Sequence, residues 1–400
     1  MFVFRFKVRF IVLTFVAVAA ATLRAADPRL QPVAPAAFSE EQRALTAAHG
    51  GEFGVGADLR VLLIHPELVK GVMPFANYIL SGSTLTPRHR ELLILRSAWR
   101  TGSQYLWAKH QERGLAAGLS AAEIAAIGGR PGASFDRHES ALLRAADELH
   151  QYSFITDDAW QVLQRTYGVH ELMDAAFTVA EMTMVANVMN SVRLDPEQRW
   201  KVADAVTPPR TADRIVPQAM SVRPRMEPVV LAQTTPDIRA MLDPSGSGRD
   251  VAAVYRTFAR HPKLYVPRQI LSEYIRTKST LSPRVREMLI LRIGWRCRSA
   301  YEWAAHAPAG RRAGLTDDQI RLLARSGYDG WSAADAAIVR AADELFDDDA
   351  IGDATWKALD DQFDERQLLD VLITTGGYRM VSMVLNTFGV PAEPNSEPFP

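Results

Sequence analysis

Two glutamate–histidine pairs are the residues of this sequence whose types and spacing could do chemistry. Glu91 and His110 lie 19 residues apart, and Glu287 and His306 repeat that spacing later in the chain. A carboxylate and an imidazole can donate and accept protons near neutral pH when burial shifts their pKa values. The pairs therefore predict acid–base catalysis, provided that the fold brings each glutamate to its histidine.

Each pair lies on two predicted helices joined by a short break. The first helix follows a Thr-Pro dipeptide at 86–87 or a Ser-Pro dipeptide at 282–283, where a capping side chain precedes proline at the first helical position. The breaks fall near 101–102 and 297–298. Two helices joined in this way form an antiparallel hairpin, so residues on their facing sides can meet.

Hydroxyl and aromatic side chains near the break are candidates for substrate contacts. A tyrosine hydroxyl there could orient a substrate carboxylate, or it could cap the break. A tryptophan three positions before the histidine shares its helix face, where it could equally serve packing. The substrate-binding candidates are Ser103, Tyr105, Trp107, Ser299, Tyr301 and Trp303.

Structural alternatives remain open for the pairs themselves. Each glutamate follows an arginine by three positions, Arg88 or Arg284, and could simply pair with it at the start of a helix. Each histidine could be a buried hydrogen-bonding group. One glutamate and one histidine per pair are too few for zinc, and glycine-rich nucleotide signatures are missing, so we predict neither a metal nor a cofactor.

The chain is a tandem duplication. Residues 83–119 overlay residues 279–315 without a gap, 196 positions later, and most of the aligned residues are identical. The register holds to Asn190 and Asn386. Apolar residues recur at three- and four-residue spacing, and alternating strand segments are absent. We therefore predict an all-α fold with a signal peptide at 1–26, helical domains at 27–206 and 237–390, a proline-rich linker at 207–236 and a loose tail at 391–400.

The hairpin segments, clearest at 85–119 and 281–315, resemble the carboxymuconolactone decarboxylase and alkylhydroperoxidase D family, whose members are small all-helical domains that assemble as trimers or hexamers. The peroxidase branch carries Glu-x11-Cys-x2-Cys-x3-His. With the pairs held in that frame, the two cysteine positions hold Ser103 and Leu106, then Ser299 and Glu302. These side chains lack thiol redox chemistry.

The decarboxylase branch of the family is closer to what the sequence retains, since it acts on an acidic lactone without a metal or an organic cofactor. The resemblance implies a cofactor-independent lyase for a small acidic or lactone-like metabolite, with both pairs catalytic and the chain a homo-oligomer. An alkylhydroperoxidase-type activity is the alternative that the family would imply. A non-catalytic binding or assembly scaffold is a third alternative, of a different class.

The two copies need not be equivalent. Glu302 stands four positions before His306, where the first copy has Leu106, and this pairing should raise the pKa of His306 above that of His110. One copy should then be the more active, and we expect that Glu287→Gln and His306→Ala each abolish activity.

Composition and the N-terminal residues indicate which partners and which cellular location to expect. Lys and Arg number 46, as do Asp and Glu, and no long run of one sign occurs, so a nucleic-acid partner is not expected. Basic residues precede a short apolar run in 1–26, which is typical of a secretory signal peptide. We expect a periplasmic or secreted protein with no membrane contact, apart from this segment if it remains as an uncleaved anchor.

The purified protein should show negligible hydroperoxide reduction, because both sulfur positions of the peroxidase frame hold other residues. Cys297 is the single cysteine and lies two positions before the frame's first cysteine, so it cannot form the redox pair. A stopped-flow assay with a dithiol reductant measures this activity. Turnover that disappears in Cys297→Ser would contradict the prediction.

Overall fold

The computed structural model describes residues 27–50, 55–129, 134–197, 200, 224–248, 250–394 and 396–400. The predicted signal peptide and residues 207–223 of the predicted linker lie outside them. Within the described residues the secondary structure is helical, without strands, which confirms the all-α tandem prediction. The first copy holds α1 (Glu40–His49), α2 (Ala57–Leu62), α3 (Pro66–Asn77), α4 (Pro87–Arg100), α5 (Gln104–Ala116), α6 (Ala121–Ile127), α7 (Arg137–Tyr152), α8 (Asp157–Leu163) and α9 (Val169–Val192).

The second copy repeats this order, and short helical turns complete both copies. The 3₁₀ turns are η1 (Pro35–Ala37) and η3 (Leu231–Gln233), and the π-helical turns are η2 (Tyr78–Gly82) and η4 (Tyr274–Lys278). The α-helices are α10 (Pro236–Leu242), α11 (Ala253–Phe258), α12 (Pro262–Glu273), α13 (Pro283–Arg296), α14 (Ala300–Arg312), α15 (Asp317–Leu323), α16 (Ala333–Asp347), α17 (Asp353–Asp360) and α18 (Glu365–Phe388).

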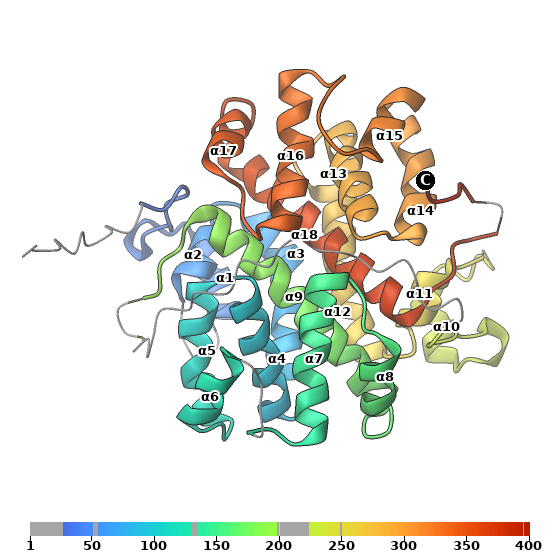
Figure 1. Cartoon of the computed structure of the whole chain (residues 1–400). Helices are drawn as coiled ribbons and strands as arrows, with labels where there is room; N and C mark the ends of the chain where they lie inside the picture. Colours follow the sequence, from blue (N-terminus) through green and yellow to red (C-terminus); the bar gives the residue numbers. More distant parts are fainter. Residues whose placement is uncertain are drawn as a thin grey trace, which may run out of the picture.

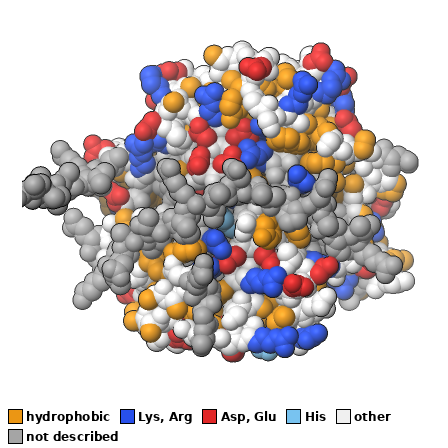
Figure 2. Space-filling view, viewed as in Figure 1, with side chains coloured by type: hydrophobic (Ala, Val, Ile, Leu, Met, Phe, Trp, Pro, Cys, Tyr) orange, Lys and Arg blue, Asp and Glu red, His pale blue; other side chains and the backbone are white. Residues whose placement is uncertain are grey.

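The long helices α9 and α18 pack together at the centre of the molecule, with α4–α7 of the first copy below them and α13–α17 of the second copy above them in Figure 1. Both are apolar on nearly every face, as expected for helices surrounded by protein. By length and composition alone each could cross a membrane, but 94% and 100% of their most apolar windows are buried inside the protein. Packing in the core therefore accounts for their apolar character. On the outside, Lys and Arg are interspersed with Asp and Glu across the face in Figure 2.

Two buried triads lock the copies to each other with approximate two-fold symmetry. In one, Tyr78 of η2 donates to Asp174 of α9 (Oη to Oδ1, 2.8 Å), and its Oη lies 2.9 Å from Nε2 of His261 in the second copy. Each π-helical turn widens the end of α3 or α12, and each carries the tyrosine that crosses the interface. The second triad consists of Tyr274, Asp370 and His65.

The N-terminal segment of each copy forms a second set of hydrogen bonds to the other copy. The backbone N–H of Arg29 donates to the end of α9, and its guanidinium donates to the carbonyl of Ile351 in the other copy (2.7 Å). Arg225 does the same at the end of α18, donating to the carbonyl of Ile155 (2.6 Å). The described part of the predicted linker, 224–236, thus belongs with the second copy as the counterpart of the arm at 28–40.

The C-terminal tail is held, so the expectation of a loose tail is wrong. The carboxylate of Glu393 accepts from the backbone N–H of Ala253 (2.7 Å), as Glu197 accepts from that of Ala57 in the first copy (2.9 Å). Phe399 packs edge-on against Trp303. The repeat therefore extends to the tail. The segment that follows α9 and the segment that follows α18 each bind the first residue of a short helix, α2 or α11.

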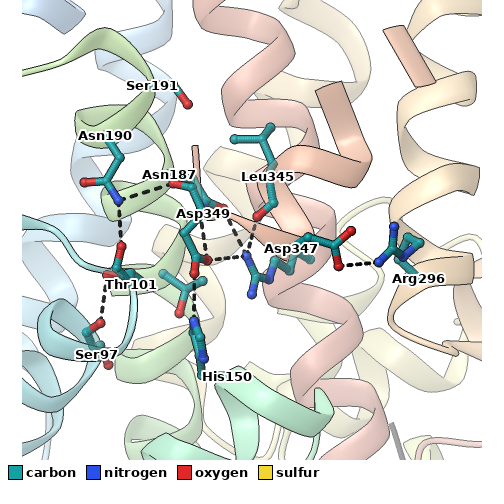
Figure 3. Close-up of polar contacts among 12 residues, drawn as sticks. Ser97, Thr101, His150, Asn187, Asn190, Ser191, Arg296, Leu345, Asp347 and Asp349 are labelled. Atoms are coloured by element: carbon teal, nitrogen blue, oxygen red, sulfur yellow. Dashed lines mark hydrogen bonds and ion pairs between the residues drawn. The ribbon is translucent and has the colours of Figure 1, made fainter. Parts of the chain in front are cut away.

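One buried polar cluster breaks the two-fold symmetry (Figure 3). His150 of α7 lies 2.8 Å from Asp349 of the second copy (Nε2 to Oδ2), and Asn187 of α9 also donates to that carboxylate. Arg379 of α18 completes the cluster as an ion pair with Asp349 (2.8 Å). The position equivalent to Asp349 in the first copy is Ser153, so this charged contact exists once.

Tyr78→Phe should lower the free energy of unfolding by about 1–3 kcal/mol, because it removes a buried hydrogen bond to the Asp174 carboxylate. Because the triad joins the copies, the loss should shift one shared unfolding transition, which calorimetry measures. Tyr152→Phe is the control: this partly buried hydroxyl has no hydrogen bond within the described residues, so its loss should cost no more than about 0.5 kcal/mol. Two separate transitions, with only one moved by Tyr78→Phe, would contradict the interlock.

Candidate active site

The break between the two helices of each hairpin is held by an asparagine near the C-terminal end of a core helix. Gly102 adopts a φ of +64°, and Arg298 adopts +52° at the same place in the second copy. The side chain of Asn190, at the end of α9, donates to the carbonyl of Thr101 (2.8 Å, Figure 3), and Asn386 of α18 donates to that of Cys297 (2.8 Å). The core helices thus hold each hairpin in register.

In the first copy the hairpin brings Glu91 of α4 to His110 of α5. Nδ1 of His110 lies 2.8 Å from Oε2 of Glu91, and both side chains are almost fully buried. Arg88 does not pair with Glu91: its guanidinium binds Glu139 (2.7 Å) and Glu123. The structural alternative of an early-helix arginine pair is therefore wrong for this glutamate, and the predicted dyad forms.

The second copy builds the same dyad with one more carboxylate. Nδ1 of His306 lies 2.7 Å from Oε2 of Glu287, and Nε2 of His306 lies 3.5 Å from Oε2 of Glu302. The histidine is thus placed between two carboxylates. Arg284 instead pairs with Asp335 (2.7 Å), so the arginine alternative is also wrong here.

The first dyad opens onto a cavity of about 350 Å³. Glu91 and His110 both line it, together with three cationic side chains and apolar residues such as Val72 and Met182. One cation, Lys109, is already paired with Asp58. The cations are Arg90, Lys109 and Arg113.

A second cavity of about 190 Å³ lies beside the second dyad. His306 and Glu302 line it, whereas Glu287 stands behind the histidine. The rest of its described wall includes four aromatic side chains, the buried Arg268 and the exposed Arg276. The two cavities therefore share a backbone plan and differ in size and in the position of their charge.

The predicted substrate-binding residues divide between wall and core. Tyr301 lines the second cavity. Tyr105 lies outside the first cavity, because its hydroxyl is bound to Asp58 (2.9 Å) and Glu197 (3.0 Å). The others are also buried away from both described cavities: Trp107 and Trp303 in the apolar cores, Ser103 before α5, and Ser299 as the N-terminal cap of α14.

Sequence reasoning missed the cations of both cavities. Lys109 and Arg113 adjoin His110 and lie one turn from it on α5, so helical spacing alone could have singled them out. Arg90 is adjacent to Glu91 in the same way. Arg268 comes from α12, far from the hairpin in sequence, and no local signal marks it.

The histidines of the two dyads have opposite pKa shifts. Burial lowers the pKa of His110 and outweighs the hydrogen bond and charge of Glu91. Burial opposes the charge of His306 too, but the hydrogen bond to Glu287 and the charge of Glu302 outweigh it and raise the pKa of His306. The predicted order of the two pKa values is confirmed. His110 is therefore neutral at pH 7, while the imidazolium is more favourable at His306 than at His110.

Comparison with known proteins identifies the fold. The model of the carboxymuconolactone decarboxylase family matches residues 66–148 and 262–344, so the chain carries two tandem carboxymuconolactone decarboxylase-like domains, and each matched segment contains one dyad. No curated protein matches the chain. Within the described residues, no group of three or more histidine, cysteine, aspartate or glutamate side chains is placed to hold a metal ion.

The two histidines should titrate at different pH values, with the His306 pKa above about 6.5 and the His110 pKa below it. By linkage, the contribution of His306 to stability is full below about pH 6.5 and is lost as pH rises through its folded pKa. The contribution of His110 is present above about pH 6.5 and is lost as pH falls through its own. NMR of the imidazole Cε1–H signals measures both. Glu302→Gln should lower the pKa of His306 and leave His110 unchanged; equal shifts in both would contradict this account.

Proposed function

We propose that the chain is a cofactor-independent, carboxymuconolactone decarboxylase-like enzyme in which a Glu/His dyad does acid–base chemistry on a small acidic or lactone-like metabolite. One observation carries the proposal: the Glu91–His110 contact lines a cavity rather than being enclosed by packed side chains. The proposal places the active site in the first copy, whereas the sequence analysis predicts that activity depends on Glu287 and His306 of the second. Three features favour the first copy: its cavity is larger, its histidine is neutral, and more cations surround the dyad.

The dyad supplies a proton acceptor. With Glu91 ionised and His110 neutral, Nδ1–H donates to the carboxylate, and this hydrogen bond fixes the tautomer that leaves the lone pair on Nε2. Nε2 can then take a proton from a substrate carbon next to a carbonyl, and Glu91 stabilises the imidazolium that forms. The same nitrogen can return the proton to another atom of the product, so the step consumes no other reactant.

The cations of the first cavity would stabilise the negative charge that develops on the substrate. Arg90 forms no ion pair within the described residues, so its guanidinium is available to a carboxylate or an enolate oxygen. Lys109 contributes less, because Asp58 already neutralises its charge. This arrangement suits an anionic substrate, in agreement with an acidic or lactone-like metabolite.

The peroxidase alternative lacks a thiol at either cavity. Cys297 is fully buried beside Ile293 and Phe346, and it lines neither described cavity. The scaffold alternative predicts no turnover at all. We also propose that the chain is exported and assembles with further copies. The basic and apolar pattern of 1–26 supports export, and the family resemblance supports assembly.

His110→Ala and Glu91→Gln should each lower turnover by about a hundred- to ten-thousand-fold, the usual contribution of a general base. A thermal-shift screen of lactones and aromatic acids comes first, because a ligand of the native state raises apparent stability. Turnover of the best ligand and melting temperature are then measured on the same preparations.

His306→Ala and Glu287→Gln are the matched controls, and they should keep most of the turnover. Because Glu91 and Glu287 are both buried, each amide substitution should cost a similar amount of stability, about 1–3 kcal/mol. Loss confined to the second-copy variants would move the active site to that copy. Unchanged turnover in all four variants would leave the scaffold as the better account.

A further inference from the structure

The cavity of the second copy contains a buried arginine without a counter-ion. Arg268 of α12 lines the cavity and is only 5% exposed, yet it forms no ion pair or side-chain hydrogen bond within the described residues. Its Nε in particular is buried without a partner. A buried charge is normally paired, because leaving it unpaired is strongly unfavourable.

The acidic groups nearest to Arg268 do not neutralise it. Glu181 of α9 is fully buried, and neither of its carboxyl oxygens has a hydrogen-bond partner among the described residues. Burial raises the pKa of Glu181 to about 8 in spite of the nearby charge of Arg268, so this carboxyl is mostly neutral at pH 7. Glu302 lies on the same cavity wall, but its carboxylate is directed to His306 (3.5 Å). The guanidinium is left to a ligand.

We propose that this cavity is a binding site for a small organic carboxylate with a flat apolar body, and that Arg268 is its counter-ion. A guanidinium presents paired N–H donors that match the two oxygens of a carboxylate. At about 190 Å³ the cavity is smaller than those that hold drug-sized ligands, which limits the ligand to about the size of one ring. The apolar wall consists largely of Tyr255, Phe258, Ile275, Tyr301, Tyr378 and Val381.

This site is not a copy of the first cavity. The positions equivalent to Arg268, Tyr255 and Tyr378 in the first copy hold valine, leucine and methionine, at 72, 59 and 182. Conversely, the first copy has cations at Lys109 and Arg113, where the second has alanine at 305 and 309. Lys109 and Arg113 of α5 are thus specific to the first cavity, and Arg268 of α12 is specific to the second. The proposal goes beyond the proposed function, since it requires catalysis at neither dyad.

The test uses 4-bromobenzoate with the full chain, and benzyl alcohol as a neutral ligand of similar shape. We expect 4-bromobenzoate to bind by calorimetry, benzyl alcohol to bind at least about tenfold more weakly, and the anomalous signal of bromine to appear in a crystal beside Arg268. Arg268→Gln should weaken 4-bromobenzoate at this site by about tenfold or more, as expected for a lost charged hydrogen bond. Arg90→Gln alters the first cavity instead and should leave the bromine signal beside Arg268.

Arg268→Met separates binding from folding. If the guanidinium is an unpaired buried charge, removing it should leave the melting temperature of the ligand-free protein unchanged or raise it, and should abolish the rise that 4-bromobenzoate causes. Bromine found only in the first cavity, or equal affinity in wild type and Arg268→Gln, would overturn the proposal. Neither result bears on the turnover of the His110 and Glu91 variants, so the two proposals fail independently.

Discussion

The packing of α9 against α18 is the constraint on which both candidate sites depend. At one end of each core helix, Asn190 or Asn386 holds the break of a hairpin that carries a dyad. Nearer the other end, Asp174 or Asp370 holds a tyrosine triad that includes a residue of the opposite copy. A shift of one core helix along the other would therefore disturb the hairpin and the interface together. The copies form one folded unit, in which each site is positioned partly by the other copy.

The same backbone supports two electrostatic states of one dyad. The pKa of His110 is depressed, whereas the hydrogen bond to Glu287 and the charge of Glu302, which stands where the first copy has Leu106, raise the pKa of His306. The distance between glutamate and histidine hardly changes, at 2.8 and 2.7 Å. The two dyads therefore differ in their electrostatics and share the geometry that positions them.

Local sequence signals predict the hairpins and the dyads, because caps, breaks and helical spacing act within about twenty residues. Arg268 escapes prediction because it comes from α12, far from the hairpin in sequence, and reaches the second cavity only after the helices have packed. The arms and tails escaped for a different reason. The motif Pro-Arg-x-x-Pro-Val at 28–33 recurs at 224–229. The prolines of the second occurrence favour a linker, although the segment is the N-terminal arm of the second copy. Trp107 lies in the apolar core rather than in a cavity wall. The sequence does not separate these two positions, because a tryptophan one turn from a histidine fits both.

The single Asp349 cluster favours the pairing of unlike halves. Two copies of the first half would set His150 against Ser153, without a carboxylate, and two copies of the second half would set Phe346 against Asp349. Only the pairing of unlike halves gives the buried histidine its acid and gives that acid both Arg379 and Asn187. The fused chain has thus lost the interchangeability of a homodimer. If it were cut between its halves, the fragments should recombine as a heterodimer in preference to either self-pairing.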